Sequence, residues 1–469
     1  MEVVVFCEKL DQNRDGGCID TVPYLLTPMY KKIALFASCF TFCFSLFAQT
    51  APESLSLEDA ITLALEKNYS IKVAKNQVRL AENDNTRAAA GMLPLITGLI
   101  QPNGLFNFSN QRFFDAVRPP LVQQGIFNRN VAANVQLTWT IFNGRSMQIT
   151  KARLEELVRA GESQAQVTIE GTIAQVTNAY YSAVQQKQQS RSLEDALTIS
   201  RERRRLAKDR YDIGQGSKVE YLTAQVDFNA DTAALIAQKL TYVNTKTQLN
   251  QLLARSLNVD FVPNDTLLLN RDLVYESLRD QTLRENPQLL LARNNSLIAN
   301  LDVRNQKALL WPTVNVVGGY TYNLLRNGGS GFGVRSGYNA NFTGGVQVAA
   351  VIFDGLNQRR RIQGAKITEE ITNLQEADVK VQIEAALQQT YQNYRNNLNL
   401  LDLEALNVKT AEQNVSIALE RYKIGVATPL ELREAQRNFI AAQIRLIQAQ
   451  LTAKTSEIEL YRLSSNIMK

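Results

Sequence analysis

The chain has 469 residues, of which 45% are hydrophobic and 20% are charged, and its formal net charge is +6. This length accommodates two or three ordinary domains, while a mean hydropathy of −0.20 excludes a protein built mainly of membrane-spanning helices. Histidine is absent, and every cysteine lies within the first 43 residues. The rest of the chain therefore lacks the commonest general base and the commonest metal ligands.

Residues 1–48 have the pattern of a secretory signal peptide. Lys31 and Lys32 precede an apolar run at 33–47, and the small residue Ala48 follows it. A run of this length is too short and wrongly flanked for a membrane-spanning helix. We therefore expect the chain to be exported from the cytoplasm.

The expected start of translation is Met29, with residues 1–28 as an extension ahead of it. A lipidated Cys39 is the alternative, although the apolar run continues for eight residues beyond it. The exported chain is expected to contain no thiol, disulfide or Cys-ligated metal, because all the cysteines lie in or before the signal peptide: Cys7, Cys18, Cys39 and Cys43.

Residues 49–262 are predicted to form one structural repeat. Short helical stretches at about 56–67 and 70–91 lead to Pro94, and β-like runs follow at about 95–110 and 130–143 around the polar loop FFDAVRPPLVQQG at 113–125. A very long helix at 146–212, a turn and a helix at 217–256 complete the repeat. Because 67 helical residues span about 100 Å, the long helix needs neighbouring helices along its whole length.

The β-like runs alternate between apolar and polar residues. In the run VQLTWTI at 135–141, Val135, Leu137, Trp139 and Ile141 alternate with Gln136, Thr138 and Thr140. Runs of about ten residues with this period fit transmembrane β-strands, although an ordinary half-buried sheet gives the same pattern. Aromatic residues suited to a membrane interface accompany the runs: Phe106, Phe108, Trp311, Tyr320 and Tyr322.

Residues 263–469 are predicted to repeat the same order. Helices at about 271–285 and 288–309 precede strands at about 313–324 and 340–353, and a long helix at 357–423 and a helix at 429–463 follow. The segment GGSGFG at 328–333 lies between two predicted strands, so it is a flexible external loop rather than a phosphate-binding loop.

The last helix carries two apolar stripes. One consists of Ala435, Phe439, Ala442, Leu446, Ala449 and Ala453, and the second consists of Ile440, Ile444, Ile447 and Leu451. Two adjacent stripes indicate a helix flanked on both sides within a curved wall. A single broad core-facing stripe is the simpler alternative.

The two halves share near-identical turns. RYDIGQGSKVEYLTAQ at 210–225 recurs as RYKIGVATPLELREAQ at 421–436, and VQLTWTIFNG at 135–144 recurs as VQVAAVIFDG at 346–355. Gly214 and Gly425 suit the left-handed residue that ends a helix. The following helices have capping signals: Ser217 and Thr428 as N-caps, Glu220 and Glu431 three residues later, and Pro429 at a first helical position.

The number of strands constrains the assembly. Two β-like runs in each half give four strands per chain, whereas a membrane tolerates no open sheet edge and the smallest closed barrels have about eight strands. If these strands span a membrane, several copies of the chain must contribute strands to one barrel.

The duplicated organisation, the F-[ND]-G before each long helix and the paired R-Y-x-I-G turns resemble the TolC-type outer-membrane efflux factors over about residues 54–465. The resemblance implies a mainly α fold with a membrane β-barrel portion: a homotrimer with a 12-stranded barrel in the outer membrane, continued by a helical barrel across the periplasm. It also implies a passive exit duct for tripartite efflux or type I secretion. Its partners would be outer-membrane lipid, a periplasmic adaptor and an inner-membrane transporter.

The resemblance assigns roles at the turns, which lie at the end of the long helices remote from the strands. Glu431 and Glu434 match an acidic pair that lines the closed aperture, and Tyr422 matches a tyrosine of the network that keeps it shut. Glu431 is also explained as a helix cap alone, whereas Glu434 lies too far into the helix for that role. The segment that contacts the adaptor would comprise Ile213, Gly214, Gln215, Ile424, Gly425 and Val426.

One position departs from the family pattern. Ala427 stands where the family has an arginine that joins the two tips, although the acidic counterpart is present as Glu220. Lys218 and Lys423 are the candidates to replace that arginine. The closed state is therefore expected to be weaker or held by different contacts.

Two other classes of function share part of this pattern. A periplasmic coiled-coil adaptor or structural protein would have the signal peptide and the apolar stripes, but it would have a single hairpin. An enzyme would need catalytic residues, and no catalytic set, cofactor site or nucleic-acid motif is evident. The sequence predicts an outer-membrane channel whose cargo is not encoded in any recognisable motif.

Overall fold

The computed structural model describes residues 53–115, 117–328 and 334–468. The expected signal peptide, Met29, the four cysteines and most of the GGSGFG segment lie outside the described residues.

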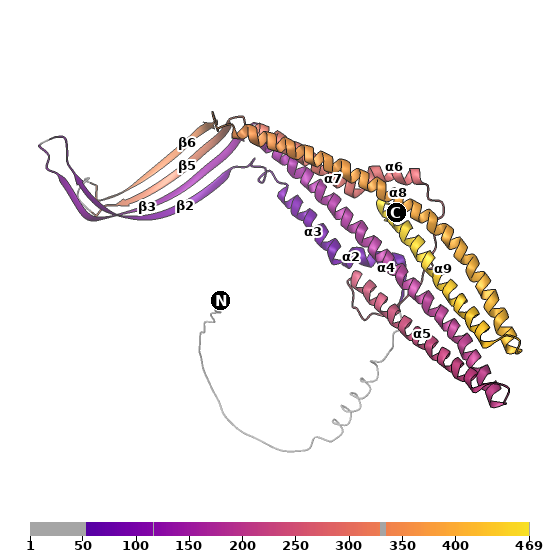
Figure 1. Cartoon of the computed structure of the whole chain (residues 1–469). Helices are drawn as coiled ribbons and strands as arrows, with labels where there is room; N and C mark the ends of the chain where they lie inside the picture. The colour runs from indigo at the N-terminus through magenta and orange to yellow at the C-terminus, as the bar shows by residue number, and fades with distance from the viewer. Residues whose placement is uncertain (1–52, 116, 329–333, 469) are drawn as a thin grey trace, which may run out of the picture. The chain divides into compact units, whose positions relative to one another are not determined.

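The described chain is built from two series of elements in the same order (Figure 1). The first series is α2 (Leu57–Lys67), α3 (Tyr69–Asp84), β2 (Leu95–Gln111), β3 (Leu121–Phe142), α4 (Ser146–Asp212) and α5 (Lys218–Leu252). The second is α6 (Tyr275–Glu285), α7 (Pro287–Ala308), β5 (Thr313–Arg326), β6 (Ser336–Ala349), α8 (Asn357–Lys423) and α9 (Pro429–Leu463). Two short strands, β1 (Glu53–Leu55) and β4 (Phe261–Pro263), pair with each other.

Several element boundaries differ from the sequence-based expectation, and three of the differences have a clear structural reason. Helix α3 ends at Asp84 rather than 91, because Thr86 starts a separate turn in which its Oγ1 accepts a hydrogen bond from the Ala89 amide at 3.1 Å. Strand β3 begins at Leu121, inside the segment expected to be a loop, because it pairs with β2 as far as Gln111. Strand β6 ends at Ala349 rather than 353, because its partner β5 starts at Thr313, directly after a proline that has no amide to donate.

The helices form a wall with a defined order of neighbours (Figure 1). In the half of the wall near the turns, α5 packs on α4, α4 on α9, and α9 on α8; nearer the sheet, α3 and α7 flank α4, and α7 packs on α8. Helix α9 therefore has a neighbour on each side, as its two apolar stripes indicated. Its Ala435 and Phe439 are buried against Val415 of α8, with Ile199 of α4 alongside.

The four long strands form one antiparallel sheet in the order β2-β3-β5-β6, with β2 and β6 at the edges. Directly paired residues share a face, so the register sorts the side chains into two sets. One face is apolar and includes Ile96, Ile100, Phe106, Val131, Val135, Leu137, Trp139, Val316, Tyr320, Tyr322, Leu324, Tyr338, Phe342, Val346 and Val348. The other is rich in amides and hydroxyls and includes Thr97, Gln101, Asn103, Asn128, Asn130, Asn134, Gln136, Thr138, Thr140, Asn315, Thr321, Asn323, Asn339, Asn341, Thr343 and Gln347.

The F-[ND]-G sequence has a structural reason at the strand-to-helix junction. The Asn143 Oδ1 accepts a hydrogen bond from the Met147 amide at 3.2 Å, and the Asp354 Oδ2 accepts one from the Gln358 amide at 2.7 Å. These bonds satisfy first-turn amides of α4 and α8. The glycines that follow, Gly144 and Gly355, both have φ +67°, a value that an L side chain adopts only with strain.

A buried core lies midway along the helices, where α2 and the short strands meet α4. Tyr180 of α4 is fully buried, and its hydroxyl donates to the Leu55 carbonyl at 2.9 Å and the Asp265 carboxylate at 2.5 Å. Its repeat counterpart Tyr391 donates to the Leu273 carbonyl at 3.2 Å. Both tyrosines therefore fasten an inter-element segment onto a long helix.

No helix among the described residues combines the length and the apolar character needed to cross a lipid bilayer.

Candidate functional site

The candidate site lies at the two helix-to-helix turns, α4–α5 and α8–α9. Each long helix ends in the same Schellman arrangement: the Gln215 amide donates to the Arg210 carbonyl at 2.8 Å, and the Val426 amide donates to the Arg421 carbonyl at 2.9 Å. Gly214 and Gly425 occupy the left-handed position, with φ +77° and +80°. The two turns are therefore the same local structure used twice.

The capping hydroxyls differ in detail between the copies. The Thr428 Oγ1 accepts from the Glu431 amide at 3.2 Å, whereas the Ser217 Oγ accepts from the Val219 amide at 3.2 Å. Glu220, which the capping pattern assigned to the same helix end, instead accepts a hydrogen bond from the other hairpin. One of the two expected cap glutamates thus has a different use in the folded chain.

Tyr422 joins the two hairpins. Its ring is fully buried, and its hydroxyl donates to the Glu220 Oε1 at 2.9 Å. The Arg210 guanidinium lies over the ring, with Cζ 4.7 Å from the centroid, and its Nη2 donates to the Tyr422 carbonyl at 2.5 Å. Arg210 also lies 3.9 Å from Glu220. Burial, and secondarily the bond to Glu220, raises the pKa of Tyr422 to about 12, so this hydroxyl is a proton donor at neutral pH.

Arg210 was not singled out from the sequence. Lys218 and Lys423 were the candidates to replace the missing arginine, yet Lys423 pairs within its own helix with Glu420 at 2.8 Å. Ala427 is buried against Tyr422 and Leu432. The arginine that contacts the second hairpin belongs instead to the repeated R-Y pair that begins each turn, and this pair was the available signal.

A second connection lies further from the turns and is partly buried. Arg203 of α4, 3% exposed, donates to the Asp227 carboxylate of α5 at 2.7 Å. Arg433 of α9 binds both oxygens of Asp231 of α5 at 2.8 and 3.0 Å, and its Nε lies 3.7 Å from Asp227. Gln436 extends this network to α4 by donating to the Ser200 hydroxyl at 2.6 Å. Three helices from two hairpins are thereby joined.

Sequence reasoning missed this network, although a comparison of the repeats contains a signal. At an offset of 211, Arg203, Asp227 and Asp231 correspond to Asn414, Asn438 and Ala442. The charged residues in the first copy are thus replaced by neutral ones in the second. Asn414 and Asn438 line an open groove of about 450 Å³ between α8 and α9, together with Arg421, Glu431 and Glu434.

The remaining predicted site residues are exposed. The carboxylates of Glu431 and Glu434 lie at that groove, separate from Tyr422, which is buried on the side of α4. At the turns Ile213 is 67% exposed, Ile424 75% and Val426 61%. The end of the two hairpins therefore presents apolar side chains to its surroundings.

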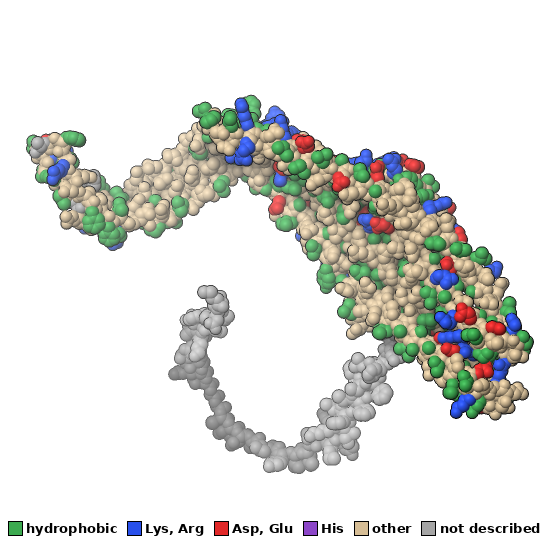
Figure 2. All heavy atoms as spheres, in the orientation of Figure 1, with side chains coloured by type: hydrophobic (Ala, Val, Ile, Leu, Met, Phe, Trp, Pro, Cys, Tyr) green, Lys and Arg blue, Asp and Glu red, His purple; other side chains and the backbone are tan. Residues whose placement is uncertain are grey.

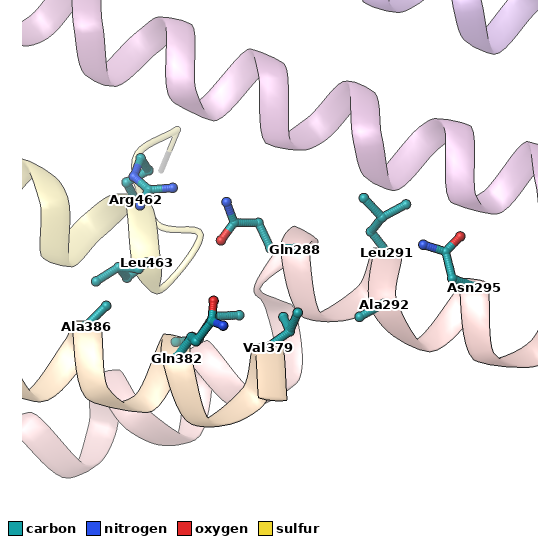
Figure 3. Close-up of a pocket in the computed structure, with 10 residues that line it drawn as sticks. Gln288, Leu291, Ala292, Asn295, Val379, Gln382, Ala386, Arg462 and Leu463 are labelled. Atoms are coloured by element: carbon teal, nitrogen blue, oxygen red, sulfur yellow. The ribbon is translucent and has the colours of Figure 1, made fainter. Parts of the chain in front are cut away.

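A hollow of about 530 Å³ lies well away from the turns (Figure 3). Figure 3 shows Gln288 of α7, Gln382 of α8 and Arg462 of α9 around it. The Arg462 guanidinium is bound by Glu459 of the same helix at 2.6 and 2.7 Å, so its charge is already compensated. The turns are the better candidate for a functional site.

The antiparallel sheet has one apolar and one polar face, and long helical hairpins that are joined near their turns continue it. This architecture defines a channel protein of the outer-membrane type. The family model of the outer membrane efflux protein matches residues 60–255 and 278–466, and the chain belongs to this family. Among its relatives, the outer membrane efflux protein BepC of Brucella suis is 22% identical over 407 residues, covering 85% of this chain and 82% of BepC. Protein CyaE of Bordetella pertussis is 26% identical over 419 residues, covering 86% of this chain and 82% of CyaE.

Solved structures agree on the fold. The outer membrane protein VceC of Vibrio cholerae superposes with a TM-score of 0.71 at 18% identity, covering 87% of this chain and 95% of VceC. The CmeC outer membrane channel of Campylobacter jejuni also gives 0.71, at 16% identity, covering 87% of this chain and 85% of CmeC. The protein is an outer-membrane efflux channel that extends into the periplasm, and the periplasmic adaptor considered as an alternative is not favoured.

Proposed function

We propose that three copies of this chain form one continuous duct, with a 12-stranded barrel in the outer membrane and a helical barrel across the periplasm. The observation that carries the proposal is that, among the residues that the structure describes, both flanks of a single chain lack a neighbour. In the sheet, β2 and β6 are edge strands, and an edge cannot remain unpaired within a bilayer. The helical wall likewise ends in α5 and α3 on one flank and α8 on the other.

Apolar side chains on the two flanks support this closure. Val226, Ile236 and Leu240 of α5 are 61% to 66% exposed, and Leu374, Val381 and Leu406 of α8 are 61% to 65% exposed. Joining α8 of one copy to α5 of the next would bury both sets and would continue the order α5–α4–α9–α8 around a ring. Exposed apolar stripes of this extent are typical of protein interfaces.

The polar face of the sheet supports a water-filled interior. Amides and hydroxyls predominate on this face, although Leu95, Leu99 and Leu105 interrupt them, and the opposite apolar face has the composition of a lipid-facing surface. A passage lined in this way does not itself select a cargo, so we assign selection to an inner-membrane transporter. The relatives include proteins named for toluene efflux and for antibiotic efflux.

We propose that the turns form the periplasmic gate. Residues 49–262 and 263–469 would be two copies of one repeat that alternate around the ring. Within a chain, Tyr422 bonds Glu220 beneath Arg210. The repeat relates these three residues to Tyr211, Glu431 and Arg421. Between chains, Tyr211 of the next copy would therefore enter the groove that contains Glu431 and Arg421.

This arrangement makes the two kinds of junction unequal. The junction within a chain has the partly buried Arg203–Asp227–Arg433–Asp231 network in addition to Tyr422, whereas the junction between chains has neutral residues at the corresponding positions. Opening is therefore expected to begin by separation between chains. Glu434 from three copies would line the aperture and favour cations over anions.

Thiol cross-linking tests the trimer and the inter-chain junction together. All native cysteines lie within the first 43 residues, ahead of the expected exported chain. A bifunctional thiol-reactive reagent long enough to span the gap left by the two long side chains should convert a Tyr211→Cys and Glu431→Cys double variant into a covalent trimer on a denaturing gel. The matched Tyr422→Cys and Glu220→Cys variant should cross-link only within a chain. Covalent oligomers from the second pair alone would contradict the proposed junction.

Conductance across a planar bilayer tests the gate. We expect Glu434→Gln to reduce the preference for cations and the block by multivalent cations. An unchanged preference and block in correctly assembled trimers would reject the carboxylate ring. The exposed residues Ile213, Gly214, Gln215, Ile424, Gly425 and Val426 are proposed to contact the hairpin of a periplasmic adaptor, and replacing Ile424 with Asp should prevent its co-purification.

A further inference from the structure

Charge is distributed very unevenly over the sheet. Within the four long strands the only charged side chains are Arg129 and Arg326. The two loops remote from the helices add Arg112, Arg118 and Arg335, with Asp115 as the single acidic residue. Figure 2 shows basic side chains at the end of the sheet farthest from the helices, and little charge along its middle. That end of the sheet carries a concentrated positive charge supplied entirely by arginine.

The register places two of these arginines side by side. Arg129 of β3 is directly paired with Arg326 of β5, and the flanking positions in the same row are Gly104 of β2 and Ser336 of β6. Like charges at directly opposed positions destabilise a sheet. Both side chains are exposed, although the Phe127 ring covers the flanking Gly104, where an added Cβ would lie 2.8 Å from it. An anion bound between the two guanidinium groups would remove the repulsion.

The pair lies on the apolar face of the sheet, at the end of the β5–β6 hairpin. Two residues along each strand from the pair, toward the helices, are the apolar residues Val131 and Leu324. In the opposite direction, the Phe127 ring lies 5.1 Å from the Arg129 guanidinium carbon and 4.6 Å from the Phe106 ring. Arginine beside aromatic rings at the edge of an apolar band is the composition expected at the level of lipid headgroups.

The carboxylate nearest in sequence does not neutralise the pair. Asp115, in the loop between β2 and β3, pairs with Arg118 at 3.7 Å. Among the described residues, no ion pair joins a carboxylate to Arg129 or Arg326. Their charge is therefore available to a ligand from outside the chain.

We propose that Arg129 and Arg326 bind a phosphate group of a phosphorylated lipid in the outer leaflet of the outer membrane. Two guanidinium groups can hold one phosphate through several parallel N–H···O bonds. The acyl chains of the same lipid would lie on the apolar surface that includes Val131 and Leu324. This inference rests on the proposed duct, in which the apolar face meets lipid and the loops face outward, and it gives each trimer three equivalent sites.

Native mass spectrometry of the detergent-purified trimer, titrated with a bis-phosphorylated glucosamine-disaccharide lipid, tests the proposal. We expect Arg129→Gln combined with Arg326→Gln to weaken binding by about tenfold or more, since several charge-assisted bonds are lost. Arg129→Lys combined with Arg326→Lys should weaken it less, because charge remains without the bidentate geometry. The control is Arg191→Gln with Arg201→Gln, which removes the same charge from exposed positions on α4.

Three results would overturn the proposal. The first is an affinity of the Arg129→Gln/Arg326→Gln variant within about twofold of wild type, a change too small for the loss of charged hydrogen bonds. The second is equal binding of the dephosphorylated lipid, or equally strong competition by inorganic phosphate, which would identify acyl contacts or free phosphate instead. The third is an equal loss in the α4 control. Trimer formation and conductance are measured on the same samples, so failure of the lipid site is distinguishable from failure of the duct.

Discussion

Removing the Tyr422 hydroxyl should favour the fully open channel, in which the junctions within each chain separate after those between chains. In Tyr422→Phe the ring stays in place, and only the 2.9 Å hydrogen bond to the Glu220 carboxylate is lost. A hydrogen bond to a charged group contributes about 1.5–3 kcal/mol. Arg210 remains 3.9 Å from Glu220, and the two side chains are 24% and 20% exposed, so the lower value is the better guide. With three copies opening together, the closed state loses about 4.5 kcal/mol, or about 10³-fold in the closed-to-open ratio.

The assay for this change is single-channel recording in a planar bilayer, with open probability as the measured quantity. Tyr242→Phe is the matched control, because the Tyr242 hydroxyl is buried and has no hydrogen-bond partner among the described residues. It should record as wild type. If Tyr422→Phe assembles into trimers and its open probability stays within twofold of wild type, the bond to Glu220 does not hold the gate closed.

Three further predictions follow from particular contacts. Asp231→Ala leaves the Arg433 guanidinium, 18% exposed, without its bidentate partner, so the closed state should lose about 3 kcal/mol. Thermal unfolding of the trimer should therefore begin at a lower temperature, and an unchanged unfolding transition would contradict this prediction. The Tyr422 pKa is raised from 10.0 to about 12, so the contribution of the neutral hydroxyl to the stability of the closed state is complete below pH 10 and is lost as pH rises through 12. The open probability of the channel should rise over that pH interval in wild type and stay flat in Tyr422→Phe. Gly144→Ala and Gly355→Ala both place alanine at φ +67°, but only the first sets a Cβ against the Ala308 carbonyl oxygen. The yield of assembled trimer should therefore fall far more in Gly144→Ala than in Gly355→Ala. Equal yields would count against this close packing at Gly144.

Much of the fold was readable because its signals are local. The ends of α4 and α8 are set by Gly214 and Gly425 and by the capping hydroxyls that follow, and each of these acts within one helical turn. The alternation of apolar and polar residues in β3 likewise reports which side chains share a face. The sequence alone therefore predicted the order of elements, the long hairpins and the repeat.

The strand boundaries were harder to predict because they depend on a partner. Residues 121–125 have no clear alternation, yet they are strand because β2 extends far enough to pair with them. Conversely, Val351, Ile352 and Phe353 have strong β propensity but lie outside β6, because β5 has no residue left to pair with them. Pairing between distant segments outweighed local preference in both cases.

The candidate site shows the same division between local and long-range information. By itself the sequence determined two equivalent turns, each with a tyrosine, an arginine and a glutamate, since these residues lie within a few positions of one another. Only the tertiary structure decided that Tyr422 meets Glu220 while Tyr211 stacks on Tyr221, with ring centroids 6.3 Å apart. It also decided that Arg433 joins Asp227 and Asp231 across two hairpins. The physical reason is that α4 packs against α9 within a chain, whereas α5 and α8 keep a flank free of the other described elements, so identical local chemistry meets different neighbours.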